Sequence, residues 1–135
     1  MYIDVAPDAC GIVNLMKHQG SERRFLKEIK GKNLRFVIPS FVIKEVKKVA
    51  DFDKDEIVAF LSKFSKKVSI ISSSSDVQLA SAYFEKKYPE SHFPDTVLLA
   101  TAMFNSYVIL TYDRTVLACA RSEGIRTICP KGINA

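Results

Sequence analysis

Short hydrophobic runs alternate with longer amphipathic segments along this chain. This alternation predicts a parallel sheet that is covered by helices on both faces. The strand candidates are rich in β-branched or aromatic residues and are bounded by polar residues or proline. They span Tyr2–Pro7, Leu34–Ile38, Lys67–Ile71, Tyr107–Thr111 and Arg126–Cys129. A sheet of five strands is therefore expected.

Between these runs, apolar residues recur at helical spacing and predict seven helices. The helices span Ala9–His18, Ser21–Lys30, Ser40–Ala50, Lys54–Phe64, Asp76–Tyr88, Asp95–Asn105 and Arg114–Glu123. Gly20, Gly31 and Gly124 follow the first, second and last of them, where a left-handed residue often ends a helix. Pro89 follows the fifth. The pattern as a whole is typical of a doubly wound α/β fold.

Composition places the chain among globular proteins of one domain, residues 1–135. Its 135 residues are 47% hydrophobic, which suits a single sizeable core. No stretch approaches the roughly 18 apolar residues of a membrane span, and no secretory leader is recognised. The cysteines, Cys10, Cys119 and Cys129, lack CxxC spacing and lie in apolar contexts, which favours reduced core thiols. We therefore expect a cytoplasmic protein with no membrane contact.

The net charge of +5 favours a polyanionic partner such as nucleic acid, although a modest excess also serves solubility. Lys44, Lys47 and Lys48 surround Glu45, and Arg114 follows an acidic residue near the end of the fourth strand. Most of these cations are expected on solvated faces. Arg114 is the favoured candidate for contact with a phosphate.

Four carboxylates interrupt the apolar stripes of the expected helices: Asp8, Glu45, Asp95 and Asp113. Burying an unpaired carboxylate costs several kcal/mol, so four such placements require a compensating positive charge. A divalent cation meets this need, because Mg²⁺ and Mn²⁺ prefer oxygen ligands. Loops after the carboxyl ends of parallel strands gather at one sheet edge, which would collect Asp8, Glu45 and Asp113. Asp95 would join them from the start of its helix.

Each acid also has a structural explanation. Asp8, Asp95 and Asp113 lie near helix N-termini, where carboxylates cap free amides and complement the helix dipole. Glu45 lies inside its helix, where no cap is needed, and its alternative is a salt bridge to a neighbouring lysine. Because the four placements coincide, a joint site is favoured over four separate explanations.

Other chemistries and folds fit less well. His18 and His92 offer general acid and base catalysis without metal, but they are far apart in the sequence and near helix ends. A phosphoacceptor receiver domain needs an aspartate at the end of the third strand, where Ile71 is followed by serines. A dinucleotide-binding domain needs a glycine-rich turn after the first strand, and only Gly11 is present there.

Taken together, four segments resemble the PIN-domain nucleases, especially the VapC-type toxins of type II toxin–antitoxin pairs. The segments are DACGIVNLM (residues 8–16), IPSFVIKEV (38–46), PDTVLLATA (94–102) and LTYDRTVLACA (110–120). The resemblance runs over nearly the whole chain. It implies a PIN-like fold, a three-layer α/β/α sandwich with a five-stranded, mainly parallel central sheet. It also implies a metal-dependent ribonuclease that cleaves single-stranded RNA by metal-assisted phosphodiester hydrolysis.

By the same resemblance, Asp8, Glu45, Asp95 and Asp113 hold one or two Mg²⁺ or Mn²⁺ ions. Thr111 matches a position where the family often has a hydroxyl that orients a carboxylate or the attacking water; an ordinary strand residue is the alternative. Cys10 stands where relatives often carry Asn or Ser. Asp4 competes with Asp8 as the first acid, but only Asp8 is followed by the apolar spacing of the motif.

The resemblance further implies a small antitoxin protein as partner and a homodimer. Two other functions remain open within this fold. One is an RNA-maturation nuclease, which these residues do not separate from a toxin. The other is a PIN-like module that has lost catalysis and binds RNA or protein; the presence of all four acids argues against it.

Overall fold

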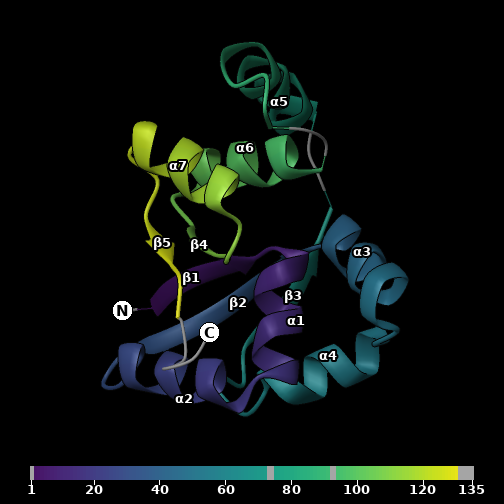
Figure 1. The fold of residues 1–135 in the computed structure, drawn as a ribbon, viewed down its shortest axis with the longest axis vertical. Helices are drawn as coiled ribbons and strands as arrows, with labels where there is room; N and C mark the ends of the chain where they lie inside the picture. Colours follow the sequence, from purple (N-terminus) through teal and green to yellow (C-terminus); the bar gives the residue numbers. More distant parts are fainter. Residues whose placement is uncertain (1, 73–74, 92–93, 131–135) are drawn as a thin grey trace.

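The computed structural model describes residues 2–72, 75–91 and 94–130, and within these ranges five strands form one sheet. All neighbouring strands run parallel, in the order β3-β2-β1-β4-β5. Figure 1 shows this sheet as the middle layer of the molecule. The strands are β1 (Tyr2–Pro7), β2 (Asn33–Pro39), β3 (Val68–Ile71), β4 (Val108–Leu110) and β5 (Thr127–Ile128).

Seven helices connect the strands within the described ranges, one for each helix expected from the sequence. They are α1 (Ala9–Lys17), α2 (Gln19–Glu28), α3 (Ser40–Ala50), α4 (Lys54–Leu61), α5 (Ser75–Lys87), α6 (Asp95–Asn105) and α7 (Arg114–Ser122). Helices α3 and α6 have the expected ends. The helix ends elsewhere differ from the expected ones by no more than a few residues.

One predicted helix stop is wrong. Gly20 lies inside α2, and α1 ends instead at Lys17, followed by His18, whose backbone is extended with φ at −123°. The chain therefore turns from α1 into α2 without a left-handed residue. Gly31 and Gly124 do adopt positive φ angles, 77° and 72°, after α2 and α7, as their position predicted.

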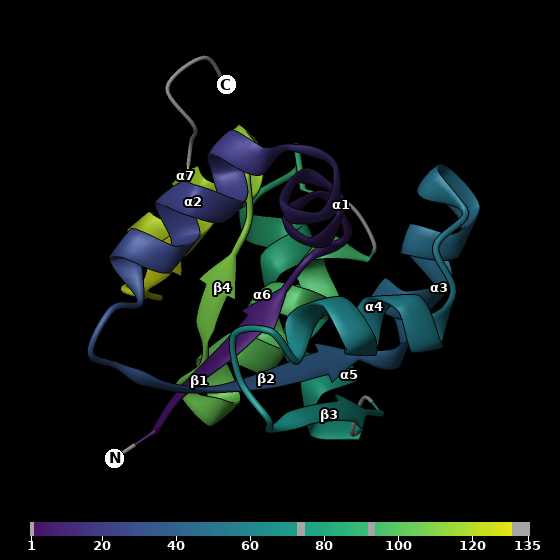
Figure 2. The same ribbon diagram turned by 90° about the horizontal axis from the view of Figure 1, so that it is seen from below.

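Helices cover the sheet on both faces and complete the PIN-like three-layer α/β/α sandwich. Helices α1 to α4 lie on one side of the sheet, and α5 to α7 lie on the other (Figures 1 and 2). Neighbouring strand residues divide between two apolar clusters: Val5 and Leu110 pack with α1 to α4, whereas Ala6 and Ile109 pack with α5 to α7. The alternation along each strand thus builds both cores.

The chain changes sides of the sheet between β1 and β4. It proceeds from β1 outward through β2 and β3, then returns to place β4 against the free side of β1. In open parallel sheets, ligands bind beyond the carboxyl ends of strands at such a switch point. Pro7 of β1 is level with Leu110 of β4, and the backbone N–H of Asp8 donates to the carbonyl of Leu110 at 3.1 Å. The residues that follow these two strands are therefore neighbours.

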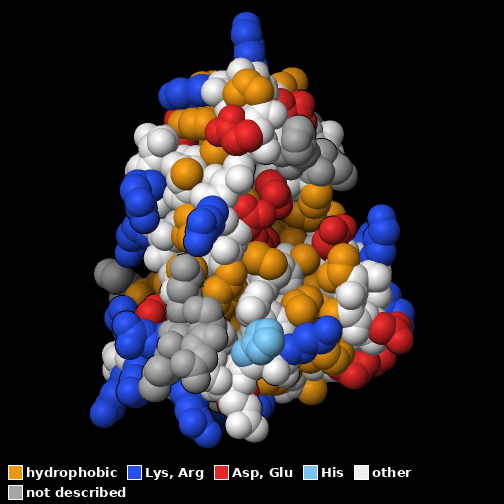
Figure 3. Space-filling model, viewed as in Figure 1, with side chains coloured by type: hydrophobic (Ala, Val, Ile, Leu, Met, Phe, Trp, Pro, Cys, Tyr) orange, Lys and Arg blue, Asp and Glu red, His pale blue; other side chains and the backbone are white. Residues whose placement is uncertain are grey.

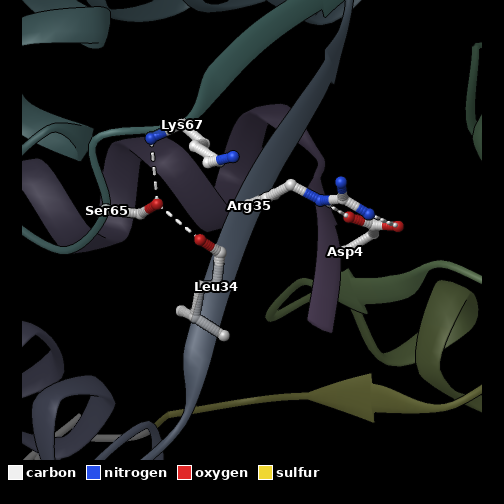
Figure 4. A network of polar contacts seen from close by, with 5 residues as sticks. All are labelled: Asp4, Leu34, Arg35, Ser65 and Lys67. Carbon is white, nitrogen blue, oxygen red and sulfur yellow. Dashed lines mark hydrogen bonds and ion pairs between the residues drawn. The ribbon is translucent and has the colours of Figure 1, made fainter. Parts of the chain in front are cut away.

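Near its beginning, β2 presents a polar side chain to solvent. Exposed Arg35 pairs with Asp4 across the β1–β2 register, with Nε and Nη2 at 2.6 and 3.1 Å from the carboxylate oxygens (Figure 4). The guanidinium also lies 5.1 Å from the ring centroid of Tyr2. Asp4 thus has its own cationic partner at the amino-terminal half of the sheet, away from the switch point.

None of the helices in residues 2–72, 75–91 and 94–130 has both the length and the apolar character needed to span a lipid bilayer.

The start of α1 lies unusually close to the end of β4. A Cβ atom at Gly11 would overlap the carbonyl oxygen of Leu110 and would approach Oδ1 of Asp8 to 3.1 Å. The obstructing atoms belong to the backbone of a central strand and to a hydrogen-bonded carboxylate, so neither yields easily. Glycine at this position is what allows α1 to approach the switch point.

Replacing Gly11 by alanine should lower the free energy of unfolding by about 1–3 kcal/mol, the usual cost of forcing atoms into a packed interior. The matched control is Gly20→Ala in the exposed part of α2, where better helix propensity should add up to about 1 kcal/mol. Urea unfolding of both variants measures the two effects. Equal stability of the two variants would contradict the close approach described here.

Candidate active site

A cavity of about 340 Å³ opens beside the switch point. Its walls come from four separate parts of the chain: the start of α1, the middle of α3, the start of α6 and the turn before α7. All four acids singled out from the sequence, Asp8, Glu45, Asp95 and Asp113, line it. Figure 3 shows acidic side chains near the centre of this face beside a hydrophobic hollow, with lysines and arginines around them.

Asp8 is the most deeply placed of the four acids, with 6% of its surface exposed. It directly follows β1 and forms the N-cap of α1, where Oδ1 accepts the backbone N–H of Gly11 at 2.7 Å. The structural explanation of this acid is therefore correct: the carboxylate does satisfy a free helix amide. The same carboxylate also lines the cavity, so capping and a role in the site coexist.

Two further side chains contact the carboxylate of Asp8. The hydroxyl of Thr111 donates to Oδ2 of Asp8, and the thiol of Cys10 lies 3.3 Å from Oδ1. Burial raises the pKa of Asp8 above its ordinary value, with a smaller contribution from the negative charge of Asp113, while the hydrogen bonds oppose the shift. Burial and the neighbouring carboxylate likewise raise the pKa of Cys10 to about 12, so its thiol is protonated at neutral pH.

Asp113 forms the N-cap of α7 two residues after Thr111. Its Oδ1 accepts the backbone N–H groups of Thr115 and Val116 at 2.8 and 3.2 Å, and its own N–H donates to the hydroxyl of Thr111 at 3.0 Å. Thr111 is fully buried and links Asp8 to Asp113 through one oxygen. This hydroxyl, which the sequence offered as a weaker candidate, connects the loops that follow β1 and β4.

Glu45 and Asp95 reach the cavity from helices on opposite sides of the sheet. Glu45 lies half-buried in the middle of α3, which packs against α1, and Asp95 is the first residue of α6. The apolar stripe that Glu45 interrupts consists of Val42, Val46 and Val49, and it is only partly buried. Val46 is inaccessible, but Val49 is 59% exposed and lines the cavity. Glu45 is thus at the rim of the core.

The donor set suits a hard divalent cation. Carboxylate oxygens are the ligands that Mg²⁺ and Mn²⁺ prefer, and within the described ranges no lysine or arginine forms an ion pair with Asp8, Glu45 or Asp113. The side chains do not stand as a closed ligand shell, since no three His, Cys, Asp or Glu residues of the described part are grouped closely enough to hold a metal ion. The acids surround a cavity, and binding an ion requires them to converge.

Sequence reasoning missed several residues of this cavity. Cys10 and Asn14 line it from α1, and Asn14 donates to the carbonyl of Cys10 at 2.9 Å. Phe41, Val13 and Leu98 contribute apolar walls. The spacing of Cys10 and Asn14, two and six residues after Asp8, was the available signal, because both share the helix that Asp8 caps. Phe41 carried no comparable signal.

The basic residues and histidines singled out from the sequence do not line the cavity within the described ranges. Lys47 pairs with Asp51 at 2.6 Å, and Lys44, Lys48 and Arg114 are exposed. His18 is exposed between α1 and α2 and is not part of the cavity wall. His92 lies outside the described residues.

No family model and no curated protein matches this sequence. Solved structures do match its fold. A toxin–antitoxin complex from Klebsiella pneumoniae is 20% identical with a TM-score of 0.66, over 96% of this chain and 99% of that one. VapBC-1 from nontypeable Haemophilus influenzae is 16% identical with a TM-score of 0.66, over 93% and 97% of the two chains.

A third similar structure is VapC20 from Mycobacterium tuberculosis, a toxin that cleaves the sarcin-ricin loop. It is 13% identical with a TM-score of 0.59, over 84% of this chain and 93% of that one. These likenesses extend over most of both chains in each comparison. The chain therefore has the PIN-like fold of the VapC toxins.

Proposed function

We propose that this protein is a divalent-metal-dependent endoribonuclease that hydrolyses single-stranded RNA, and that it is the toxin of a toxin–antitoxin pair. One observation carries the proposal: four acids from distant segments line a single cavity at the switch point of a VapC-like fold. Ligands of open parallel sheets bind at that point, and a group of carboxylates there favours a cation as the ligand.

Each acid has a distinct place in the proposed site. Asp8 and Asp113 are fixed by backbone amides at helix starts and by the shared hydroxyl of Thr111. Glu45 and Asp95 line the same cavity from α3 and α6 and would complete the ligand set. A bound Mg²⁺ or Mn²⁺ supplies Lewis acidity toward the phosphate and lowers the pKa of a water molecule. Thr111 holds Asp8 in place and keeps its orientation toward the cavity.

The charge distribution supports a nucleic-acid substrate. The chain has a net charge of +5, and on the face drawn in Figure 3 lysines and arginines lie around an acidic centre. A polyanion is therefore attracted to the protein but approaches the carboxylates only with a cation present. Arg114 is exposed directly after Asp113, where it would contact a phosphate of the bound strand. The similar structures include toxin–antitoxin complexes, which supports a small antitoxin protein as the partner that inhibits this one. The proposal of a homodimer rests on the family resemblance alone.

Replacing the acids one at a time, as Asp8→Asn, Glu45→Gln, Asp95→Asn and Asp113→Asn, should each lower the rate of RNA cleavage by about 10²–10³-fold, the usual loss for one electrostatic group of a catalytic site. Cleavage of a labelled single-stranded RNA with Mg²⁺ or Mn²⁺, and again with EDTA, measures the effect. The matched control is Asp4→Asn, because Asp4 lies on β1, four residues before Asp8, is paired with Arg35 and should leave the rate unchanged when replaced. Cleavage that survives EDTA and all four substitutions would exclude a metal nuclease.

Replacing Asp8 by asparagine should also stabilise the metal-free protein by a few degrees at neutral pH. Burial raises the pKa of Asp8 in the folded state, so ionisation of this group opposes folding. An asparagine keeps an acceptor for the N–H of Gly11 and carries no charge. Calorimetry in EDTA compares the melting temperatures of the two proteins.

The pH dependence of this difference follows from the same shift. Below the unfolded value of about 4, Asp8 is protonated in both states and the variant has little advantage. As the pH rises from that value through the raised pKa of Asp8 in the folded state, the wild-type protein loses free energy of unfolding, and its melting temperature falls further below that of Asp8→Asn. A variant that is less stable than wild type at every pH would contradict the raised pKa.

A further inference from the structure

Two consecutive backbone N–H groups after β4 donate hydrogen bonds to side chains that in turn contact Asp8. The N–H of Asp113 donates to the hydroxyl of Thr111 at 3.0 Å, and that hydroxyl donates to Oδ2 of Asp8. The N–H of Tyr112 donates to the sulfur of Cys10 at 3.3 Å. The two connections run side by side, one through an oxygen and one through a sulfur.

The thiol hydrogen of Cys10 completes the second connection. Three acceptors lie within its range: Oδ1 of Asp8 at 3.3 Å, Oδ2 of Asp8 at 3.5 Å and the hydroxyl of Thr111 at 3.5 Å. The thiol has a single hydrogen, and Oδ1 is its nearest acceptor. Because the sulfur accepts from Tyr112 while its hydrogen reaches Asp8, the side chain links the loop after β4 to the loop after β1.

We propose that Cys10 is a positioning residue of the candidate active site, which fixes the carboxylate of Asp8 so that Oδ2 is left to meet a cation. This inference rests on the proposed function for the cation. A carboxylate offers about four lone-pair sites. On Asp8, the N–H of Gly11 and the thiol occupy Oδ1, and the hydroxyl of Thr111 occupies one site of Oδ2. The remaining site is on Oδ2.

The thiol has this role because its contacts are directional rather than only apolar. Cys10 is half-buried at the cavity wall, so filling core volume is not its main function. Without the thiol, the N–H of Tyr112 loses its acceptor and Oδ1 regains a free lone pair. The carboxylate then has two orientations toward the cavity in place of one. A serine retains both a donor and an acceptor and should keep the arrangement.

The experiment compares Cys10→Ala and Cys10→Ser with the wild-type protein by titration with MnCl₂ in a calorimeter. Loss of a group that orients a metal ligand typically weakens affinity about 10–100-fold, so Cys10→Ala should bind Mn²⁺ more weakly by that factor. Cys10→Ser should restore most of the affinity. In RNA cleavage, kcat should fall in Cys10→Ala while KM stays near the wild-type value, because Cys10 acts through Asp8. Hydrogen exchange of the Tyr112 amide should quicken in Cys10→Ala and slow again in Cys10→Ser.

Cys119 provides the matched control. It is a buried thiol of α7, 3.1 Å from the hydroxyl of Ser91, and is not part of the cavity wall. Cys119→Ala should lower the melting temperature and leave Mn²⁺ affinity unchanged. If Cys119→Ala weakens Mn²⁺ binding as much as Cys10→Ala does, the effect is one of general stability and the positioning role is wrong.

The outcomes separate this inference from the proposed function. A wild-type protein that neither binds Mn²⁺ nor cleaves RNA overturns the proposed function, and the assignment of Oδ2 to a cation fails with it. A wild-type protein that binds and cleaves, with Cys10→Ala equal to it in both, overturns only the role of Cys10. If Cys10→Ala binds Mn²⁺ more weakly and Cys10→Ser binds it nearly as well as the wild-type protein, both the proposed function and the role of Cys10 are supported.

Discussion

A carboxylate buried beyond the carboxyl ends of two parallel strands, β1 and β4, is the constraint on which the rest of this structure depends. Asp8 directly follows β1, is almost inaccessible, and would be strongly disfavoured as an anion without its contacts to Gly11, Thr111 and Cys10. Those contacts come from α1 and from the loop after β4. The charge is therefore tolerated only if both segments are in place, and this requirement ties the site to the topology of the sheet.

The topology in turn explains why Asp8 lines the cavity and Asp4 does not. Asp4 and Asp8 are four residues apart on the same segment, yet Asp4 points to an exposed arginine across the β1–β2 register and Asp8 lines the cavity. The first is neutralised by its neighbour, and the second lies at the switch point without a described cationic partner. A buried acid without a cationic partner lowers the free energy of unfolding, and such unfavourable placements are common among functional groups.

Most of the fold could be predicted from the sequence because each strand and helix carries its own hydrophobic period. Helix α3 begins and ends as expected, and Asp8 was preferred to Asp4 from the apolar spacing that follows it. The errors arise where tertiary contacts decide. Gly20 lies inside α2, since the extended backbone of His18 already separates α1 from α2. Val49 is exposed at the cavity wall although it continues the apolar stripe of α3. No local pattern encodes either outcome. His92 lies outside the described residues, so its expected position stays a prediction.

The candidate site shows the same division between local and tertiary information. The acids were visible in the sequence because charges in apolar stripes are conspicuous, whereas the contacts of Cys10 join residues about a hundred positions apart. Similar structures at 13–20% identity share the fold over most of their length, so the hydrophobic pattern tolerates extensive substitution. Position 10 has a stricter requirement than the hydrophobic positions, because its side chain must supply one hydrogen-bond donor toward Asp8 and one acceptor for the N–H of Tyr112. A side chain that can both donate and accept a hydrogen bond satisfies the geometry. An apolar side chain of the same size leaves the partly buried N–H of Tyr112 without its acceptor and leaves Oδ1 of Asp8 with the N–H of Gly11 as its remaining donor.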